Sequence, residues 1–343
     1  MGSVTLAAYG ELARRRGKQP VGTIVLRPEE LARLAGGRPD RLPTLASKQR
    51  RSSGGRSPSS RGDGRRRHAA GRNARRPRWG SGVVNVRRLG ERVKGLRLQA
   101  GASILMYHAI GEADEPASRF VVPVRSFRRQ MAWLGRCGYH VLSLDRLLRY
   151  LDEAERPPPR SVVITFDDGY VDNLALAAPV LGRFGFPATV FVATCEVGGV
   201  ADWTPEPALN GRRLLSWEGL AALCASGSID LGAHTRTHLS LRSSDLETAR
   251  AEIEGSLEDL RGRGFSARSF AYPFGHSTPD TRAFVRDAGF ASALGVQPGR
   301  ARTDCDGYAL PRYEIRGRDS LATFAFTLAL GRRPPTLGGR RRT

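Results

Sequence analysis

The sequence predicts an α/β fold, a parallel barrel of seven or eight strand–helix units, over residues 101–330. From Gly101 onward, short apolar runs of strand length alternate with amphipathic stretches, which is the pattern of a parallel sheet or barrel. Neither GxGxxG nor GxxxxGK[ST] follows an early strand, so a nucleotide-binding doubly wound sheet is disfavoured. The length also fits a barrel better than an open sheet.

The predicted elements follow the chain in that alternating order. Ser161–Phe166 (SVVITF) is the clearest strand, because β-branched side chains pack well on a pleated surface. The predicted strands are Ala102–Tyr107, Val141–Leu142, Ser161–Phe166, Ala188–Val192, Ile229–Ala233, Ser269–Ala271 and Leu310–Ile315. The predicted helices are Phe127–Cys137, Leu144–Leu151, Asn173–Phe184, Ser216–Ser226 with Ser216 as N-cap, Asp245–Gly264, Thr278–Gly289 and Ser320–Leu330. The loop from Glu196 to Leu215, rich in Gly, Pro and Trp, interrupts the alternation.

The positive charge of the chain lies in its two ends. The formal net charge is +22, but residues 1–100 hold 25 Lys and Arg against 6 Asp and Glu, and residues 331–343 add five Arg and no acid. Residues 101–330 hold 25 basic and 27 acidic side chains. A nucleic-acid-binding fold carries its positive charge on the fold itself, so no nucleic-acid partner is required. Weak contact with anionic surfaces is the partner role left for the basic ends.

Three regions follow from this distribution: a basic, largely disordered region over residues 1–98, a folded domain over 99–330, and a basic disordered tail over 331–343. Pro28–Ala35 predicts one short helix in the first region. Residues 46–80 consist largely of Arg, Gly and Ser, and bury too little to offset the entropy of ordering. A solvated leader is favoured there over a segment that binds RNA or an anionic surface.

The sequence shows no address for export or for a membrane. No apolar run reaches the roughly 18 residues of a membrane span. At the N-terminus a short apolar stretch precedes the basic one, which is the reverse of a secretory signal. The chain as written is expected in the cytoplasm, whereas a misassigned start would fit the cell envelope. Four scattered cysteines without a CxxC pair indicate neither a zinc ribbon nor a disulfide framework.

Three polar clusters stand directly after predicted strands. Asp167 and Asp168 follow SVVITF, His234–His238 (HTRTH) follows IDLGA, and Tyr272–Gly275 (YPFG) follows SFA. The carboxyl ends of parallel strands share one face of a barrel, and barrels of this kind build their active sites on that face. The three clusters are therefore predicted to form one site.

The residue types in these clusters indicate a metal-dependent hydrolase. Adjacent carboxylates after a buried strand need a counter-charge, and a divalent cation would supply it. Two histidines four residues apart can both ligate that cation, and one carboxylate completes a three-ligand set with open positions. Bound water can then ionise near neutral pH, with the second aspartate free to act as general base. Asp-Asp-Gly alone would indicate a helix-capping turn and HxxxH alone a pair of surface histidines; together they favour the metal site.

These motifs, in this order, resemble those of the polysaccharide deacetylase family, the NodB-like carbohydrate esterases. The matching segments are TFDDGY at Thr165–Tyr170, HTRTH at His234–His238 and FAYPFG at Phe270–Gly275. MYHAI at Met106–Ile110 resembles the opening strand of one branch of the family. The resemblance spans about residues 101–320, and the first two motifs carry most of its specificity.

The resemblance implies a distorted (β/α)7 barrel and a divalent ion, Zn²⁺ first, with Co²⁺ or Ni²⁺ as alternatives. It assigns the metal to Asp168, His234 and His238, and it assigns the general base to Asp167. Thr235 would help to orient the histidine loop. The implied partner is an acetylated carbohydrate substrate.

The third motif implies the remaining groups, with one departure. The backbone N–H of Phe274 would donate to the oxyanion, and the side chains of Tyr272 and Phe274 would wall the sugar pocket. The family usually carries an Arg, which steadies the catalytic base, where this chain has Ala271. Arg312, in LPRYEI, is our hypothesis for the group that restores this charge beside Asp167.

The chain departs from the family a second time, because it lacks the late Leu-x-His motif whose histidine acts as the general acid. His108 or His276 could take that role, since imidazole titrates in the required range. Each also fits a simpler description, His108 as a hydrogen-bonded strand end and His276 as a loop residue. Trp203 and Trp217 could stack on sugar rings, but core packing is the expectation for a tryptophan that follows a helix cap. His140 is expected to pack.

The preferred function is hydrolysis of N-acetyl groups from an N-acetylglucosamine-containing polysaccharide, oligosaccharide or glycolipid. An O-acetyl carbohydrate esterase is an alternative, because an alkoxide leaves more readily than an amine and depends less on an acid. A non-catalytic protein that binds metal and sugar is another. A metal phosphoesterase would suit the Asp and His inventory, but it normally needs a second metal and more ligands.

Overall fold

The computed structural model describes residues 4–5, 25–26, 101–112 and 114–334. Eight strands form one sheet, in which seven follow the order β13–β12–β11–β8–β7–β3–β14 with every neighbouring pair parallel, and β6 (His140–Leu142) pairs with β7 off this path. The bounds of the seven are β3 Ser103–Tyr107, β7 Ser161–Phe166, β8 Ala188–Val192, β11 Ile229–Ala233, β12 Ser269–Ala271, β13 Ser292–Leu294 and β14 Tyr313–Glu314. The predicted α/β class with a parallel sheet is confirmed.

The sheet curls until its two edges approach each other. The segment that enters β14 bridges back to β13 through Leu310, whose N–H donates to the Ala293 carbonyl at 2.9 Å. On one side of β7, the strand β6 (His140–Leu142) pairs with the first half, so that β8 pairs only with Thr165 and Phe166. This inserted strand separates β7 from β8 over half their length and accounts for the distortion of the predicted barrel.

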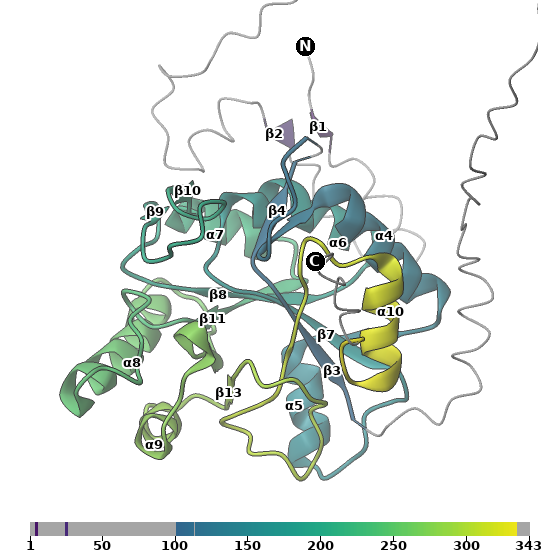
Figure 1. Cartoon of the computed structure of the whole chain (residues 1–343). Helices are drawn as coiled ribbons and strands as arrows, with labels where there is room; N and C mark the ends of the chain where they lie inside the picture. Colours follow the sequence, from purple (N-terminus) through teal and green to yellow (C-terminus); the bar gives the residue numbers. More distant parts are fainter. Residues whose placement is uncertain (1–3, 6–24, 27–100, 113, 335–343) are drawn as a thin grey trace, which may run out of the picture.

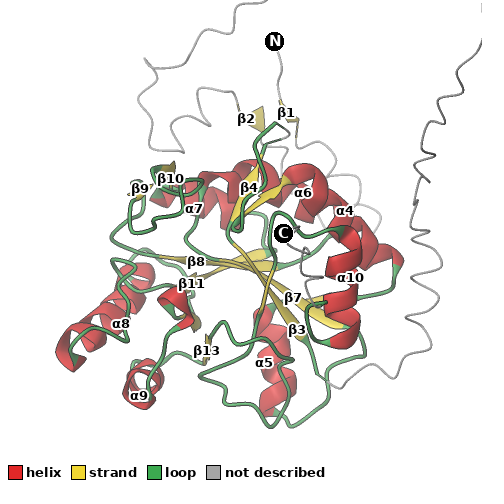
Figure 2. Ribbon diagram, in the orientation of Figure 1, coloured by secondary structure: helices red, strands yellow, loops and turns green. Residues whose placement is uncertain are grey.

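Helices surround the strands, as Figures 1 and 2 show. Their bounds are α4 Val124–Arg136, α5 Leu144–Asp152, α6 Ala178–Phe184, α7 Trp217–Cys224, α8 Leu246–Arg261, α9 Pro279–Asp287 and α10 Leu321–Leu330. α7 to α10 begin after N-cap residues whose side-chain oxygens accept backbone N–H bonds, namely Ser216, which was predicted as a cap, and Asp245, Thr278 and Ser320, which were predicted as the first residues of their helices. Each such cap stabilises a helix by about 1 kcal/mol, which explains why these starts could be read from the sequence.

Two apolar layers hold the sheet in place. Leu105, with alternate residues of the other strands, packs outward against the helices, whereas Ile104 and Val163 point into the curled sheet. Successive side chains of a strand face opposite sides, so a strand that is apolar at every position serves both layers. The inner layer lies beneath the ends of the strands and supports the residues that follow them.

Six short elements were not predicted. They are β4 Ala109–Gly111, β5 Val121–Pro123, β9 Val200–Ala201, β10 Arg212–Arg213, β13, and the 3₁₀ turn η3 Pro273–Gly275. The predicted helix Asn173–Phe184 begins as the π-helical segment η2 (Asn173–Ala177), and the predicted last strand is shortened to β14. Runs of two or three residues are too short for hydrophobic periodicity to identify.

Several expectations fall outside the described residues. Of the first 100 residues, the structure describes two short strands, β1 (Val4–Thr5) and β2 (Val25–Leu26), which pair antiparallel. The helix predicted at Pro28–Ala35, the Arg-rich segment and most of the basic tail are not described, so the domain bounds remain predictions. Within the described part of the chain, no helix has the length and apolar character needed to cross a membrane.

Candidate active site

The predicted polar clusters meet at the carboxyl ends of β7, β11 and β12. Asp168 follows β7 and His234 follows β11, with His238 four residues further along. One ligand atom of each of these three side chains lies within 4.8 Å of the other two, and all three residues are buried. Among the described residues, this is the one group of His, Cys, Asp and Glu that could hold a metal ion.

The three side chains face one another in a form suited to ligation. Asp168 Oδ1 lies 3.2 Å from His238 Nε2 and 3.6 Å from His234 Nε2. His234 Nδ1 lies 2.7 Å from the carbonyl oxygen of Ala271. Because a carbonyl only accepts, Nδ1 must carry the proton, and the lone pair of Nε2 points toward Asp168.

Burial and neighbouring charge set the protonation of this group. Burial would raise the pKa of Asp168, but the hydrogen bond and charge of His238 hold that pKa well below its ordinary value. Burial lowers the pKa of His234 to about 4, although Asp167 acts in the opposite direction. At neutral pH the carboxylate is therefore charged and the imidazole of His234 is neutral, as metal ligands must be.

The backbone of the motifs is strained. Asp168, Thr235, His238 and Phe274 have φ angles of 74°, 64°, 58° and 58°. They are four of the six non-glycine residues with positive φ in the described chain. Such conformations cost about 1–3 kcal/mol each and persist where the surrounding structure fixes them, commonly at functional sites.

Asp167 is held by a fully buried arginine. Arg312 Nη1 and Nη2 donate to its two carboxylate oxygens at 2.7 and 2.8 Å, and Arg312 Nε donates to the Gly295 carbonyl at 2.8 Å. Arg312 is 0% exposed and Asp167 is 3% exposed. Burial would raise the pKa of Asp167, but the charge of Arg312, aided by two nearby histidines, holds it below its ordinary value. The structure thus places Arg312 where the sequence hypothesis put the missing charge.

Two aromatic side chains flank His238. The Trp203 ring stacks on it at 4.5 Å between centroids and an angle of 14°, and the Phe274 ring meets it edge-on at 4.9 Å. Phe274 is 46% exposed, which agrees with a place on the wall of the site. Trp203 lies between β9 and β10, in the loop that could not be assigned from sequence.

Tyr272 does not wall a pocket, so that prediction is wrong. Its side chain is 0% exposed and belongs to the layer between sheet and helices. Its hydroxyl donates to the Tyr308 carbonyl at 2.9 Å, and its ring packs edge-on against Phe270. The reason is the alternation that follows a strand, which turns Tyr272 outward into the core.

The two histidines considered as the general acid have different surroundings. His108 is half-buried beside Phe120, and its charge acts on the carboxylates of both Asp167 and Asp168. His276 is exposed, with its ring 6.2 Å from that of Phe274. The geometry therefore favours His108 over His276.

Trp217 and His140, which were both expected to pack, lie outside the site. Trp217 packs against the main core beneath Arg263, as expected of a tryptophan that follows a helix cap. His140 is exposed on β6, so the expectation that it packs is wrong. The strand β6 is only three residues long, and its first side chain remains outside the core.

Comparison with known proteins agrees with this geometry. The family model described as polysaccharide deacetylase matches residues 154–293. The Bacillus subtilis (strain 168) protein YxkH, named for the same family, is 29% identical over 214 residues, which are 62% of this chain and 70% of that protein. The poly-beta-1,6-N-acetyl-D-glucosamine N-deacetylase of Staphylococcus epidermidis is 25% identical over 246 residues, 65% of this chain and 82% of that protein. The structure of IcaB from Ammonifex degensii aligns with a TM-score of 0.58 at 25% identity, over 68% of this chain and 98% of that one.

In its matched segment, its relatives and its fold, this chain is similar to the polysaccharide deacetylase family. Its fold is the barrel of the deacetylase structures. The matched residues run from the approach to β7 as far as β13 and contain the Asp168, His234 and His238 set. His108 and Arg312 lie outside the matched residues, so the two groups that complete the surroundings of Asp167 come from the first and last strands of the sheet.

Proposed function

We propose that this deacetylase removes N-acetyl groups from poly-β-1,6-N-acetylglucosamine with the help of a divalent cation, Zn²⁺ first, with Co²⁺ or Ni²⁺ as alternatives. The observation that carries the proposal is the buried Asp168, His234 and His238 set beside an ionised Asp167. The polymer is taken from the Staphylococcus epidermidis relative, whose name gives that substrate.

The residues present fit a cation. Two imidazole nitrogens and one carboxylate oxygen form a donor set that Zn²⁺ and similar ions accept. Asp168 Oδ1 is buried and lies 3.2 Å from His238 Nε2 and 3.6 Å from His234 Nε2, so the three donor atoms converge on one point. A cation held by these three residues would supply positive charge that polarises the acetyl carbonyl and lowers the pKa of water.

The protein side chains would then carry the proton transfers. Asp167 takes a proton from the attacking water, whose oxygen adds to the acetyl carbonyl carbon. The N–H of Phe274, displayed by a turn with φ of 58°, donates to the oxyanion that forms. His108 gives a proton to the nitrogen as the C–N bond breaks, so that acetate and a free amine leave. Arg312 keeps Asp167 ionised and oriented throughout.

The aromatic side chains provide the surface for the sugar. The Trp203 and Phe274 rings flank His238, and Phe274 is largely exposed. Aromatic rings offer large, rigid apolar faces at low entropic cost, which suits the apolar face of a pyranose. We therefore place the N-acetylglucosamine unit against these rings, with its acetyl group over Asp167 and Asp168.

Acetate release tests the proposal. The full chain is incubated with β-1,6-linked N-acetylglucosamine oligomers, with β-1,4-linked oligomers and with acetylated xylan oligomers, each with Zn²⁺, with Co²⁺ and with a chelator. Preferred release from the β-1,6 oligomers that is lost on chelation and restored by metal supports the proposal. Preferred release from the β-1,4 oligomers contradicts the polymer. Release from xylan alone supports an esterase, and no release by a chain that retains metal supports a binding protein.

His238→Ala is expected to weaken Zn²⁺ binding by at least about 100-fold, because loss of even an outer partner of a ligand costs 10–100-fold. Titration against a fluorescent zinc chelator measures the effect, and acetate release should fall with it. His140→Ala is the matched control, since His140 is exposed on β6. Equal zinc affinity in the two variants would contradict the assignment of His238.

A further inference from the structure

Arg212 is the centre of an ionic cluster that lies outside the metal centre. Its Nε donates to Asp172 Oδ2 at 2.8 Å, and its Nη1 donates to Glu115 Oε1 at 2.6 Å. Its Nη2 reaches the Ile110 carbonyl at 3.3 Å. Arg212 belongs to β10, Ile110 to β4, and Asp172 immediately precedes η2. One guanidinium thus joins segments separated by about 40–100 residues of sequence.

The same cluster fixes the backbone next to His108. Asp172 Oδ1 accepts the N–H of Ile110 at 2.6 Å, so both backbone groups of Ile110 are held, one by Asp172 and one by Arg212. Asn173 Nδ2 donates to the His108 carbonyl at 3.0 Å and to Asp172 Oδ1 at 3.1 Å. These bonds leave the chain on the C-terminal side of His108 little freedom to move.

On its other side the cluster anchors the hairpin that carries Trp203. Arg212 pairs with Ala201 in the antiparallel β9–β10 hairpin, and Trp203 lies between the two strands. A small apolar cluster, separate from the two main layers, joins the hairpin to β4 and β5; its buried members are Ala109, Val121, Tyr170, Ala201, Leu209 and Leu214. The stacking of Trp203 on His238 therefore depends on where this hairpin is held.

We propose that Arg212 is a positioning residue of the deacetylase, which holds the Trp203 hairpin and the His108 segment in place beside the metal centre. It acts through Asp172 and Glu115 and touches neither the metal ligands nor the substrate. The inference rests on the proposed function, because holding these two segments in place would keep the sugar-binding site at a constant width. Glu115 and Asp172 are partly buried, and each carboxylate needs a counter-charge. This need explains why the residue between them is an arginine.

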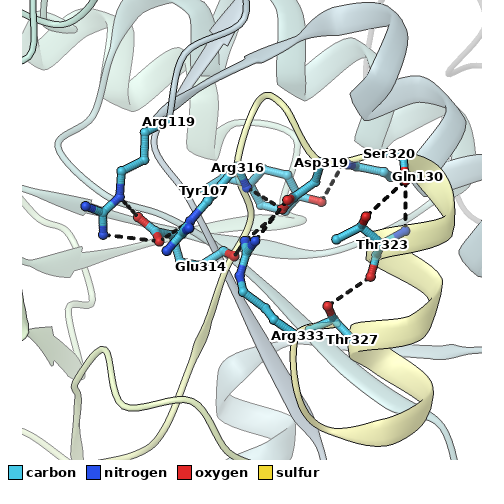
Figure 3. A network of polar contacts seen from close by, with 10 residues as sticks. All are labelled: Tyr107, Arg119, Gln130, Glu314, Arg316, Asp319, Ser320, Thr323, Thr327 and Arg333. Carbon is cyan, nitrogen blue, oxygen red and sulfur yellow. Dashed lines mark hydrogen bonds and ion pairs between the residues drawn. The ribbon is translucent and has the colours of Figure 1, made fainter. Parts of the chain in front are cut away.

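A second ionic cluster in the same chain gives a matched comparison. Figure 3 shows Arg119, Arg316 and Arg333 around Glu314 and Asp319. Arg333 binds both oxygens of Asp319 and so joins the two ends of α10. Arg333→Gln removes the same kind of ion pair as Arg212→Gln, but it leaves the hairpin and the His108 segment untouched.

Kinetics of five variants test the proposal: Arg212→Gln, Arg212→Lys, Trp203→Ala, the combination of Arg212→Gln with Trp203→Ala, and Arg333→Gln. We expect Arg212→Gln to raise KM for the β-1,6 oligomers by about tenfold with a smaller change in kcat, because uniform substrate binding is lost. The double variant should be no worse than the poorer single variant, since both changes remove the same contact. Arg212→Lys should recover part of the loss, and Arg333→Gln should lower Tm alone. Effects of Arg212→Gln and Trp203→Ala that multiply, or a KM that Arg333→Gln raises equally, would overturn the proposal.

Amide hydrogen exchange tests whether Arg212 holds the hairpin, and its result does not depend on whether the enzyme releases acetate. Amides of residues 199–213 should exchange at least about tenfold faster in Arg212→Gln than in the wild type, whereas those of β7 and β8 should not change. If the wild type releases no acetate, the proposed function fails, and the exchange experiment still decides whether Arg212 holds the hairpin. Unchanged exchange over residues 199–213 overturns the inference even in an active enzyme.

Discussion

Asp167→Asn is expected to lower kcat for acetate release by about 10²–10⁴-fold, the usual contribution of a general base, while Zn²⁺ remains bound. An amide of the same shape cannot take the proton of the attacking water. The metal ligands Asp168, His234 and His238 are unchanged, so zinc stoichiometry should stay at the wild-type value. Steady-state kinetics beside metal analysis of the purified variant measures both quantities.

The control for this variant must also lose a carboxylate paired with arginine, because Asp167→Asn leaves the buried charge of Arg312 uncompensated. Glu314→Gln meets the condition, since Glu314 is mostly buried and receives hydrogen bonds from Arg119 and Arg316 (Figure 3). Both variants should melt at a lower temperature, but only Asp167→Asn should lose turnover in samples shown to be folded. A kcat above about one tenth of the wild-type value would exclude Asp167 as the base.

The parts of the fold that could be predicted are those whose physical signal is local. Ser161–Phe166, Ala188–Val192 and Ile229–Ala233 are mostly apolar segments of five or six residues, and their bounds match the structure. The helix starts after Ser216 and Asp245 follow from side chains that accept hydrogen bonds from their own helix. The place of the metal centre could be predicted as well, because polar residues that follow parallel strands share one rim.

The parts that could not be predicted depend on contacts between distant segments. Trp203 stacks on His238 only because the β9–β10 hairpin is held over the rim, and two-residue strands give no periodic signal. The sequence indicated that Trp203 could stack on a sugar ring, but nothing in it predicted the contact with His238. Tyr272 was misplaced because it shares a motif with Phe274. Tyr272 continues the alternation of β12 and faces the helices, whereas Phe274 lies in the 3₁₀ turn η3 with a φ of 58° and is exposed.

Arg312→Gln is expected to cost about 3–5 kcal/mol of folding free energy at neutral pH, the usual result of removing one partner from a buried ion pair. Arg312 and Asp167 are nearly inaccessible to solvent, so solvent screening does little to weaken their interaction. Arg312→Lys should cost less, because it keeps the charge but loses the paired hydrogen bonds to the carboxylate. Urea unfolding of the wild type and both variants, with zinc removed, measures the differences.

The pH dependence of that cost gives a signature that simple loss of packing would not. Asp167 has a folded-state pKa below its ordinary value of 3.8, so the stability it gains from Arg312 is present above that value and is lost as pH falls through the folded pKa. Without Arg312, burial should instead raise the pKa of Asp167, and the carboxyl will take up a proton at a higher pH. The stability deficit of Arg312→Gln should therefore be largest at neutral pH and shrink as the solution is acidified. A deficit that stays constant from pH 7 to pH 4 would mean that Arg312 acts by filling space, and a different group would then have to supply the positive charge that steadies Asp167.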